Sequence, residues 1–155
     1  MKNEFQQKLC NNFLRLQATS PDDMKVLSAL LQDSIVPTAD ILYTPSHKKV
    51  IMVLQRFQWE LTKNAEIIGE PIGYQRCLCG LVIDKVEYMQ TRQIDMNDRS
   101  QFLNFLTFYE SDQRLDLQFS GSKTIRLSIN GLKLTAKDFG ESWPTTQRPK
   151  HEETT

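Results

Sequence analysis

Two cysteines two residues apart are the pattern in this sequence that comes closest to a chemical site. Cys77 and Cys79 lie in a stretch that we expect to be a strand. Because side chains two apart on a strand share a face, both thiolates could reach one metal ion or form a redox pair. A tetrahedral metal site needs two more ligands, and His47 and His151 fall in a predicted turn and a predicted tail. We therefore favour the alternative that both thiols are small buried groups, and we expect no metal and no cofactor.

Other catalytic patterns are incomplete. The run Asp138-Phe139-Gly140 spells the magnesium motif of protein kinases, but the glycine-rich loop and the catalytic loop of a kinase are missing. Asp84 with Glu87, or Asp112 with Asp116, could act as an acid and base pair, although carboxylates in strands and turns are usually solvated. No nucleophile elbow and no nucleotide-binding glycine motif occurs. We leave an enzymatic role open and favour a protein without one.

A set of aromatic and charged residues could instead form an interaction surface. Arg, Trp and Tyr are enriched among the residues that dominate binding energy. The candidates are Arg56, Trp59, Glu60, Tyr74 and Trp143. The alternative, which we favour, is that the aromatic rings cover the core and that Arg56 lies outside them.

Charge and hydropathy narrow the range of partners. Lys and Arg together number 19, as do Asp and Glu, so the formal net charge is zero. The protein therefore has no overall positive charge that would attract a polyanion. Two short basic clusters, at residues 47–49 and 148–151, could contact phosphate, but we favour the alternative that they are a solvated turn and a solvated tail. The longest apolar run, residues 50–54, is far shorter than the roughly 20 residues that span a bilayer. We expect no membrane partner and do not expect nucleic acid.

The cysteines and the first residues suggest a compartment. Three cysteines are an odd number, which fits a reducing environment. The opening residues have no apolar stretch of the kind that a secretory signal carries. We expect a cytoplasmic protein.

The chain has the length and composition of one domain. At 155 residues, with 39% apolar and 25% charged residues, it can bury a single core. We predict a flexible lead-in over residues 1–12, one globular domain over 13–143 and a disordered tail over 144–155.

One helix is signalled clearly. In Ser20-Pro21-Asp22-Asp23 a capping hydroxyl precedes a proline that suits the first helical position and two carboxylates that favour the positive end of the helix dipole. An apolar stripe follows at spacings of three and four: Met24, Leu27, Leu30, Leu31 and Ile35. We predict an amphipathic helix from Pro21 to about Ser34, ended by Val36-Pro37.

The rest of the chain is typical of strands. We predict strands at residues 13–18, 40–44, 49–60, 105–109, 115–120, 125–129 and 132–136, and one bent strand or two at 76–93. We also predict a long loop at 61–73 and a short helix that begins at Asn97-Asp98 and contains Phe102 and Leu103. The predicted fold class is α+β. An antiparallel meander or half-open barrel of about seven strands, resembling pleckstrin-homology domains by analogy only, is covered by the N-terminal helix.

Several segments together resemble a family of bacterial proteins known as domain of unknown function 2948. They are residues 27–33, Arg56-Phe57-Gln58-Trp59-Glu60, residues 125–129, and Asp138-Phe139-Gly140 closing toward Trp143. The resemblance runs from about Leu14 to about Pro149. It implies a bacterial cytoplasmic origin, makes a metabolic enzyme of familiar type less expected and assigns no functional residue.

Three functions stay open. The first is a non-catalytic binding or regulatory module that contacts another protein through an exposed strand edge or the Trp59 region. The second is a small-molecule-binding domain or minor enzyme with a pocket at the mouth of the sheet, where Cys77, Cys79 or a carboxylate is the polar group. The third is an RNA-associated protein. The sequence leaves the oligomeric state undetermined.

Overall fold

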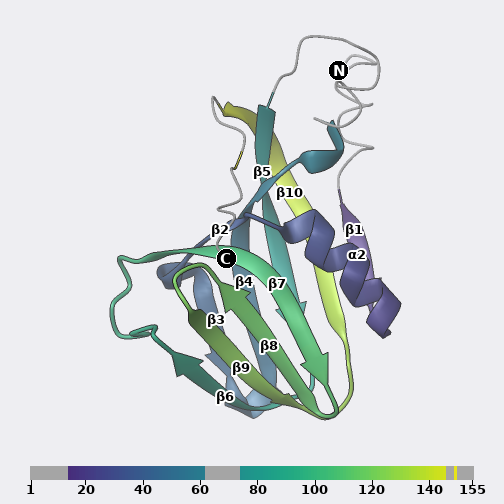
Figure 1. The fold of residues 1–155 in the computed structure, drawn as a ribbon, viewed down its shortest axis with the longest axis vertical. Coiled ribbons are helices and arrows are strands. Elements are labelled where there is room, and N and C mark those ends of the chain that lie inside the picture. The colour runs from purple at the N-terminus through teal and green to yellow at the C-terminus, as the bar shows by residue number, and fades with distance from the viewer. Residues whose placement is uncertain (1–13, 62–73, 146–148, 150–155) are drawn as a thin grey trace.

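A single antiparallel sheet dominates the computed structural model, which describes residues 14–61, 74–145 and 149 (Figure 1). The order of its strands is β1-β10-β5-β4-β2-β7-β8-β9-β6, with β3 paired to β4. The elements are β1 (Arg15–Ala18), α2 (Pro21–Leu31), β2 (Ile35–Pro37), η1 (Thr38–Asp40), β3 (Ile41–Thr44), η2 (Pro45–His47), β4 (Lys49–Phe57), β5 (Tyr74–Ile83), β6 (Val86–Arg92), β7 (Phe102–Ser111), β8 (Arg114–Phe119), β9 (Lys123–Ile129) and β10 (Leu134–Thr145). The predicted antiparallel sheet is confirmed. Within the described ranges it has ten strands rather than about seven.

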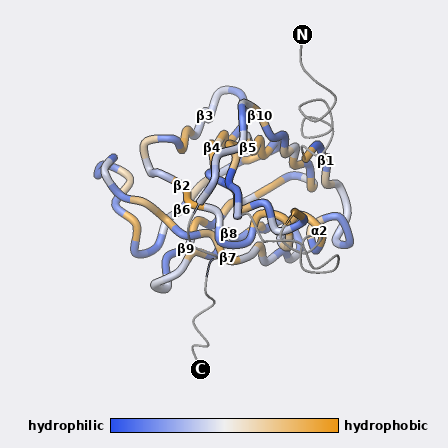
Figure 2. The backbone as a smooth tube through the Cα atoms, turned by 90° about the horizontal axis from the view of Figure 1, so that it is seen from above, coloured by the Kyte–Doolittle hydropathy of each residue, from blue (hydrophilic) through white to orange (hydrophobic). Residues whose placement is uncertain are grey.

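The sheet folds over at β2 into two layers. Ile35 pairs with Gln55 of β4 on one side and with Asn104 of β7 on the other. Figures 1 and 2 show β4, β5 and β10 in one layer and β7, β8 and β9 in the other. Alternate side chains of both layers fill the space between them, because neighbouring residues on a strand point to opposite faces.

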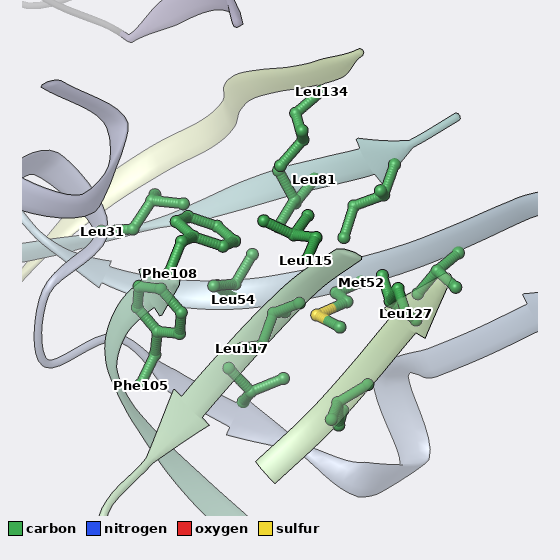
Figure 3. Packing of buried hydrophobic residues seen from close by; sticks show 14 of the residues in the cluster. Leu31, Met52, Leu54, Leu81, Phe105, Phe108, Leu115, Leu117, Leu127 and Leu134 are labelled. Atoms are coloured by element: carbon green, nitrogen blue, oxygen red, sulfur yellow. The ribbon is translucent and has the colours of Figure 1, made fainter. Parts of the chain in front are cut away.

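The core lies between these layers. Met52, Leu54 and Leu81 come from one layer, and Leu115 and Leu117 from the other (Figure 3). Helix α2 packs beside β7, β1 and β4, and it buries Met24, Leu27 and Leu31. None of the helices in the part of the chain that the structure describes is long and apolar enough to cross a membrane.

The predicted start of the helix is confirmed. The Ser20 hydroxyl accepts a hydrogen bond from the Asp23 amide at 3.2 Å, and the Asp23 carboxylate accepts one from the Thr19 amide at 2.9 Å. These two bonds form a reciprocal capping arrangement. The Thr19 amide chiefly, and then the Ser20 hydroxyl, lowers the pKa of the Asp23 carboxyl from its ordinary value.

The predicted end of the helix is wrong. The helix stops at Leu31, and Asp33 adopts a left-handed conformation with φ of 63°. The Asp33 amide donates to the Phe105 carbonyl at 2.8 Å, and the Phe105 amide donates to the Ser34 carbonyl at 2.9 Å. Pairing with β7 therefore replaces the last helical turn, and Ile35–Pro37 becomes a strand.

Two further predictions about local structure are wrong. The strand predicted over residues 49–60 stops at Phe57, and residues 59–61 are helical. The Gln58 amide still donates to the carbonyl of Gln75, the next position of the β5 register, at 2.9 Å, but the Gln58 carbonyl accepts the Leu61 amide at 3.2 Å, so a helical turn replaces the strand from here. The short helix predicted after Asn97-Asp98 is absent from this described segment, because the Gln101 carbonyl accepts the Thr38 amide at 2.9 Å and β7 already begins at Phe102.

Several strand predictions are confirmed, and one strand is longer than expected. Residues 76–93 form two strands, β5 and β6, and β8 and β9 form the predicted hairpin. Strand β10 extends from Leu134 to Thr145, past the predicted start of the tail at residue 144. Three predictions concern segments outside the described residues. They are the lead-in at 1–12, most of the loop at 61–73, and the tail at 146–148 and 150–155.

Candidate functional site

The five predicted interaction residues gather at one end of β4, β5 and β10, but they differ in exposure. Arg56 is fully buried, whereas Trp59, Glu60, Tyr74 and Trp143 are half-buried. The indole N–H of Trp59 donates to the Gln32 carbonyl at 2.9 Å, which fixes this ring against the end of α2. Since Arg56 has no exposed surface, contact with a partner at this end would fall to the other four.

Arg56 holds two carboxylates at once. Its Nε donates to Asp138 Oδ1 at 3.0 Å and its Nη2 to Asp138 Oδ2 at 2.6 Å. Its Nη1 and Nη2 also donate to Glu60 Oε2 at 3.0 Å and Oε1 at 2.7 Å. Such bidentate pairs are the strongest hydrogen bonds that side chains make. They raise the pKa of Arg56, outweighing the burial that opposes its charge.

The register of the sheet explains why this charged centre is buried. Along β4 the buried side chains alternate through Met52 and Leu54 to Arg56, so Arg56 continues the core face. Asp138 lies on β10, and Cys79 of β5 is its cross-strand partner. The Leu14 amide donates to Asp138 Oδ2 at 2.7 Å. The centre is satisfied from within the chain and closes the end of the core, which makes it a structural element.

The two thiols belong to the same centre. Burial chiefly, and then the charge of Asp138, raises the pKa of Cys77 to about 12 and raises the pKa of Cys79 as well. A thiol that stays protonated is a poor nucleophile and a poor metal ligand. Among the described residues no three His, Cys, Asp or Glu side chains are grouped so that they could hold a metal ion. The positive guanidinium of Arg56 further disfavours a cation here.

One of the two candidate acid pairs, Asp84 with Glu87, is bound by the lysines of a basic cluster. Lys49 pairs with Asp84 at 3.5 Å, and Lys48 pairs with Glu87 at 3.3 Å. Asp84 and Glu87 are thus each held by a lysine rather than by each other. The same contacts reduce the positive potential that residues 47–49 could offer to a polyanion.

A groove between α2 and β7 is a second candidate site. Its volume is about 400 Å³. The residues that line it come from two elements: Pro21, Met24, Lys25 and Ser28 from the helix side, and Thr107, Phe108, Tyr109 and Glu110 from the strand. Met24 and Phe108 are 4% and 8% exposed and form an apolar floor, while Tyr109 is 61% exposed at the opening.

This groove lies along an open edge of β7. Strand β7 pairs with β2 only over Phe102–Asn104, whereas it pairs with β8 from Phe105 to Ser111. Past Phe105, no strand in the described part of the chain pairs with the edge that faces α2. The Phe108 amide donates there to the Ser28 hydroxyl at 3.3 Å. A side chain has taken the place of a neighbouring strand.

Sequence reasoning missed the groove. Ser28 and Phe108 are 80 positions apart, and neither carries a motif. The only sequence signal was indirect: a polar serine on the flank of the apolar stripe, which the structure places against a strand.

Comparison with known proteins identifies a family for this chain. A family model described as a protein of unknown function, DUF2948, matches residues 14–151. This match confirms the resemblance read from the sequence. No curated protein and no solved structure matches the chain.

Proposed function

The chain belongs to the DUF2948 family, and we propose that it is a non-catalytic module that binds an extended segment of a partner protein in the groove between α2 and β7. The observation that carries the proposal is the open edge of β7 beside that groove. An exposed sheet edge can accept a further strand, with main-chain hydrogen bonds supplying affinity and side-chain pockets supplying specificity.

The main chain of β7 offers the pairing groups. The Phe108 amide points toward α2, since it donates to Ser28 there. In an antiparallel strand the groups two residues on point to the same side, so Glu110 presents its amide and carbonyl to the groove. A partner strand would pair at Glu110 and run along the first turns of α2.

The walls of the groove define the partner's side chains. Met24 and Phe108 provide a floor for one apolar side chain. Lys25 on the helix and Glu110 on the strand carry opposite charges on the two walls. The preferred segment is therefore an extended one with an apolar residue flanked by a basic and an acidic residue.

A displayed library of short peptides tests this proposal. We expect the selected peptides to shift the amide resonances of residues 24–28 and 107–111 in the ¹⁵N spectrum of the full chain. Glu110→Pro removes one edge amide that no strand uses, a position at which proline is tolerated, and it should abolish peptide binding while the thermal unfolding curve shows a folded protein.

A matched pair of charge reversals provides the control. Lys25→Glu reverses a charge on the helix wall of the groove. Lys137→Glu makes the same charge reversal at an exposed position of β10, away from the groove. Only Lys25→Glu should weaken binding. Peptides that instead shift resonances around Trp59, Tyr74 and Trp143 would move the interaction surface to the residues first predicted from the sequence and reject the groove.

The finer description of the fold is also part of this proposal. Two layers joined at β2, with β1 and β6 at the free ends of the strand order, support a half-open barrel covered by α2. The likeness to pleckstrin-homology domains is an analogy of shape. An experimental structure whose two layers lie flat in one open sheet would reject it.

The proposed setting is the bacterial cytoplasm. The free, buried thiols of Cys77 and Cys79 support a reducing compartment. Fractionation of the native cell, with detection of the chain by antibody, tests this location. Recovery outside the cytoplasmic fraction would contradict it.

A further inference from the structure

A second groove, separate from the one between α2 and β7, lies on the outer face of β6, β9 and β8. Its volume is about 560 Å³. Every residue that lines it is polar or charged: Gln90, Thr91, Arg92, Asp116, Gln118, Thr124 and Arg126. The core-facing residues of β8 alternate with these, since Leu115 and Leu117 are buried on the opposite face.

Arg126 is held in the middle of this groove. Its Nε donates to Asp116 Oδ1 at 3.0 Å and its Nη2 to Asp116 Oδ2 at 3.2 Å. The side chain of Arg126 remains 48% exposed, so its other N–H bonds are available to a ligand. Arg114, which does not line the groove, lies beside the same carboxylate, with its Nε 3.7 Å from Asp116 Oδ2.

Arg92 supplies a second guanidinium from the edge strand. It is the cross-strand partner of Thr124, and Gln90 is the partner of Arg126. Arg92 and Arg126 are therefore diagonal neighbours, about 7–8 Å apart between their Cα atoms. Within the described residues the exposed side chain of Arg92 makes no hydrogen bond or ion pair.

The polar floor of the groove is ordered in advance. The Thr124 hydroxyl donates to Gln118 Oε1 at 3.0 Å, and Gln118 Nε2 donates to the Lys123 carbonyl at 3.4 Å. Fixed hydroxyl and amide groups lower the entropy that a ligand must offset on binding.

We infer that this groove binds the phosphate group of a small phosphate monoester. Two guanidiniums, from Arg92 and Arg126, line the groove together with a single carboxylate, from Asp116, which leaves an excess of positive charge. A phosphate monoester carries about −1.5 to −2 charges at neutral pH. The planar fork of arginine donates pairs of hydrogen bonds to such an oxyanion. Asp116 holds Arg126 in place, and Arg92, which has no partner among the residues that the structure describes, is the cation that binds the ligand from the edge strand.

Titration of the full chain with inorganic phosphate tests this inference. We expect saturable shifts of the amide resonances of Gln90, Thr91, Arg92, Thr124 and Arg126, at constant ionic strength set with chloride. Shifts that chloride alone reproduces, or shifts that do not saturate, would overturn the inference.

Matched arginine variants locate the binding. Arg92→Gln should weaken phosphate binding at least tenfold, whereas Arg15→Gln, which removes an exposed arginine from β1 at the other end of the strand order, should leave it unchanged. Equal affinities of Arg92→Gln and the unaltered chain would reject the groove.

Succinate, titrated in parallel, distinguishes the ligand class. Tighter binding of phosphate supports a phosphate monoester. Tighter binding of succinate would overturn that assignment in favour of a dicarboxylate. Neither result depends on the peptide groove, because the two grooves share no lining residue.

Discussion

Two arginine–aspartate pairs of similar geometry lie on opposite faces of the sheet. Arg56 and Asp138 are joined at 3.0 and 2.6 Å, and Arg126 and Asp116 at 3.0 and 3.2 Å. The side chains of the first pair are both 0% exposed, whereas those of the second are 48% and 11% exposed.

The difference in burial assigns the pairs different roles. Water cannot reach Arg56 to replace a lost partner, so the stability of each buried charge depends on the presence of the other. Water can replace a lost partner of Arg126, so that pair contributes little to folding and keeps donors for a ligand. Bidentate geometry alone therefore does not distinguish a structural pair from a binding one.

The largest effect is expected from Asp138→Ala. It leaves the buried guanidinium of Arg56 with Glu60 as its remaining carboxylate, and the free energy of unfolding should fall by about 3–5 kcal/mol. Urea denaturation at neutral pH measures this change. A loss under about 1 kcal/mol would show that the buried pair resembles the exposed one.

Removing both buried charges should cost less than removing one. The double variant Arg56→Met, Asp138→Leu removes both charges of the pair, so neither is left buried alone. It should therefore be more stable than Asp138→Ala. The same urea denaturation, run on Arg56→Met, Asp138→Leu and their combination, gives the coupling energy. Strictly additive losses would contradict the dependence of each charge on the other.

The buried thiols beside the Arg56–Asp138 pair should make the free energy of unfolding depend on pH in the alkaline range. The folded state raises the pKa of Cys77 from 9.0 to about 12, so the unfolded chain loses this proton first. The stability that this thiol contributes is fully present below about pH 9 and is lost as the pH rises toward about 12.

The variant that carries both Cys77→Ala and Cys79→Ala isolates this contribution from the lysines and tyrosines that titrate in the same range. Its free energy of unfolding should fall less steeply between pH 9 and 11 than that of the unaltered chain. Parallel curves would show that the buried thiols are not held protonated by folding.

The smallest effect on stability is expected from Arg126→Ala. The exposed pair contributes at most about 1 kcal/mol, and added salt should reduce even that difference. Thermal unfolding at low and high salt measures it. A loss as large as that of Asp138→Ala would make the outer pair structural and remove the basis for a ligand site there.

Much of the local structure could be predicted because its causes are local. The Ser20 cap, the hairpin of β8 and β9, and the alternation along β4 all depend on residues within a few positions of each other. Predictions were wrong where a distant strand competed for the backbone. Phe105 converts the end of the predicted helix into β2, and Thr38 binds the Gln101 carbonyl where a short helix was predicted.

The candidate sites were harder to predict than the elements. Arg56 was expected to lie outside the aromatic residues, because a charged residue among aromatics usually does, yet its alternation with Leu54 places it on the core face. Nothing near Arg56 in the sequence reveals Asp138, which is 82 positions away. Asp116 was considered as half of an acid pair, whereas its partner is Arg126 on the next strand.

By itself the sequence determined the antiparallel sheet, the start of α2, most strands and the family, because these depend on short-range hydrogen bonding, strand alternation and recurring segments. The tertiary structure alone decided which charges are buried, which strand edge stays open and where grooves form. These depend on the register between strands far apart in the chain, since register determines which side chains meet and which are removed from water.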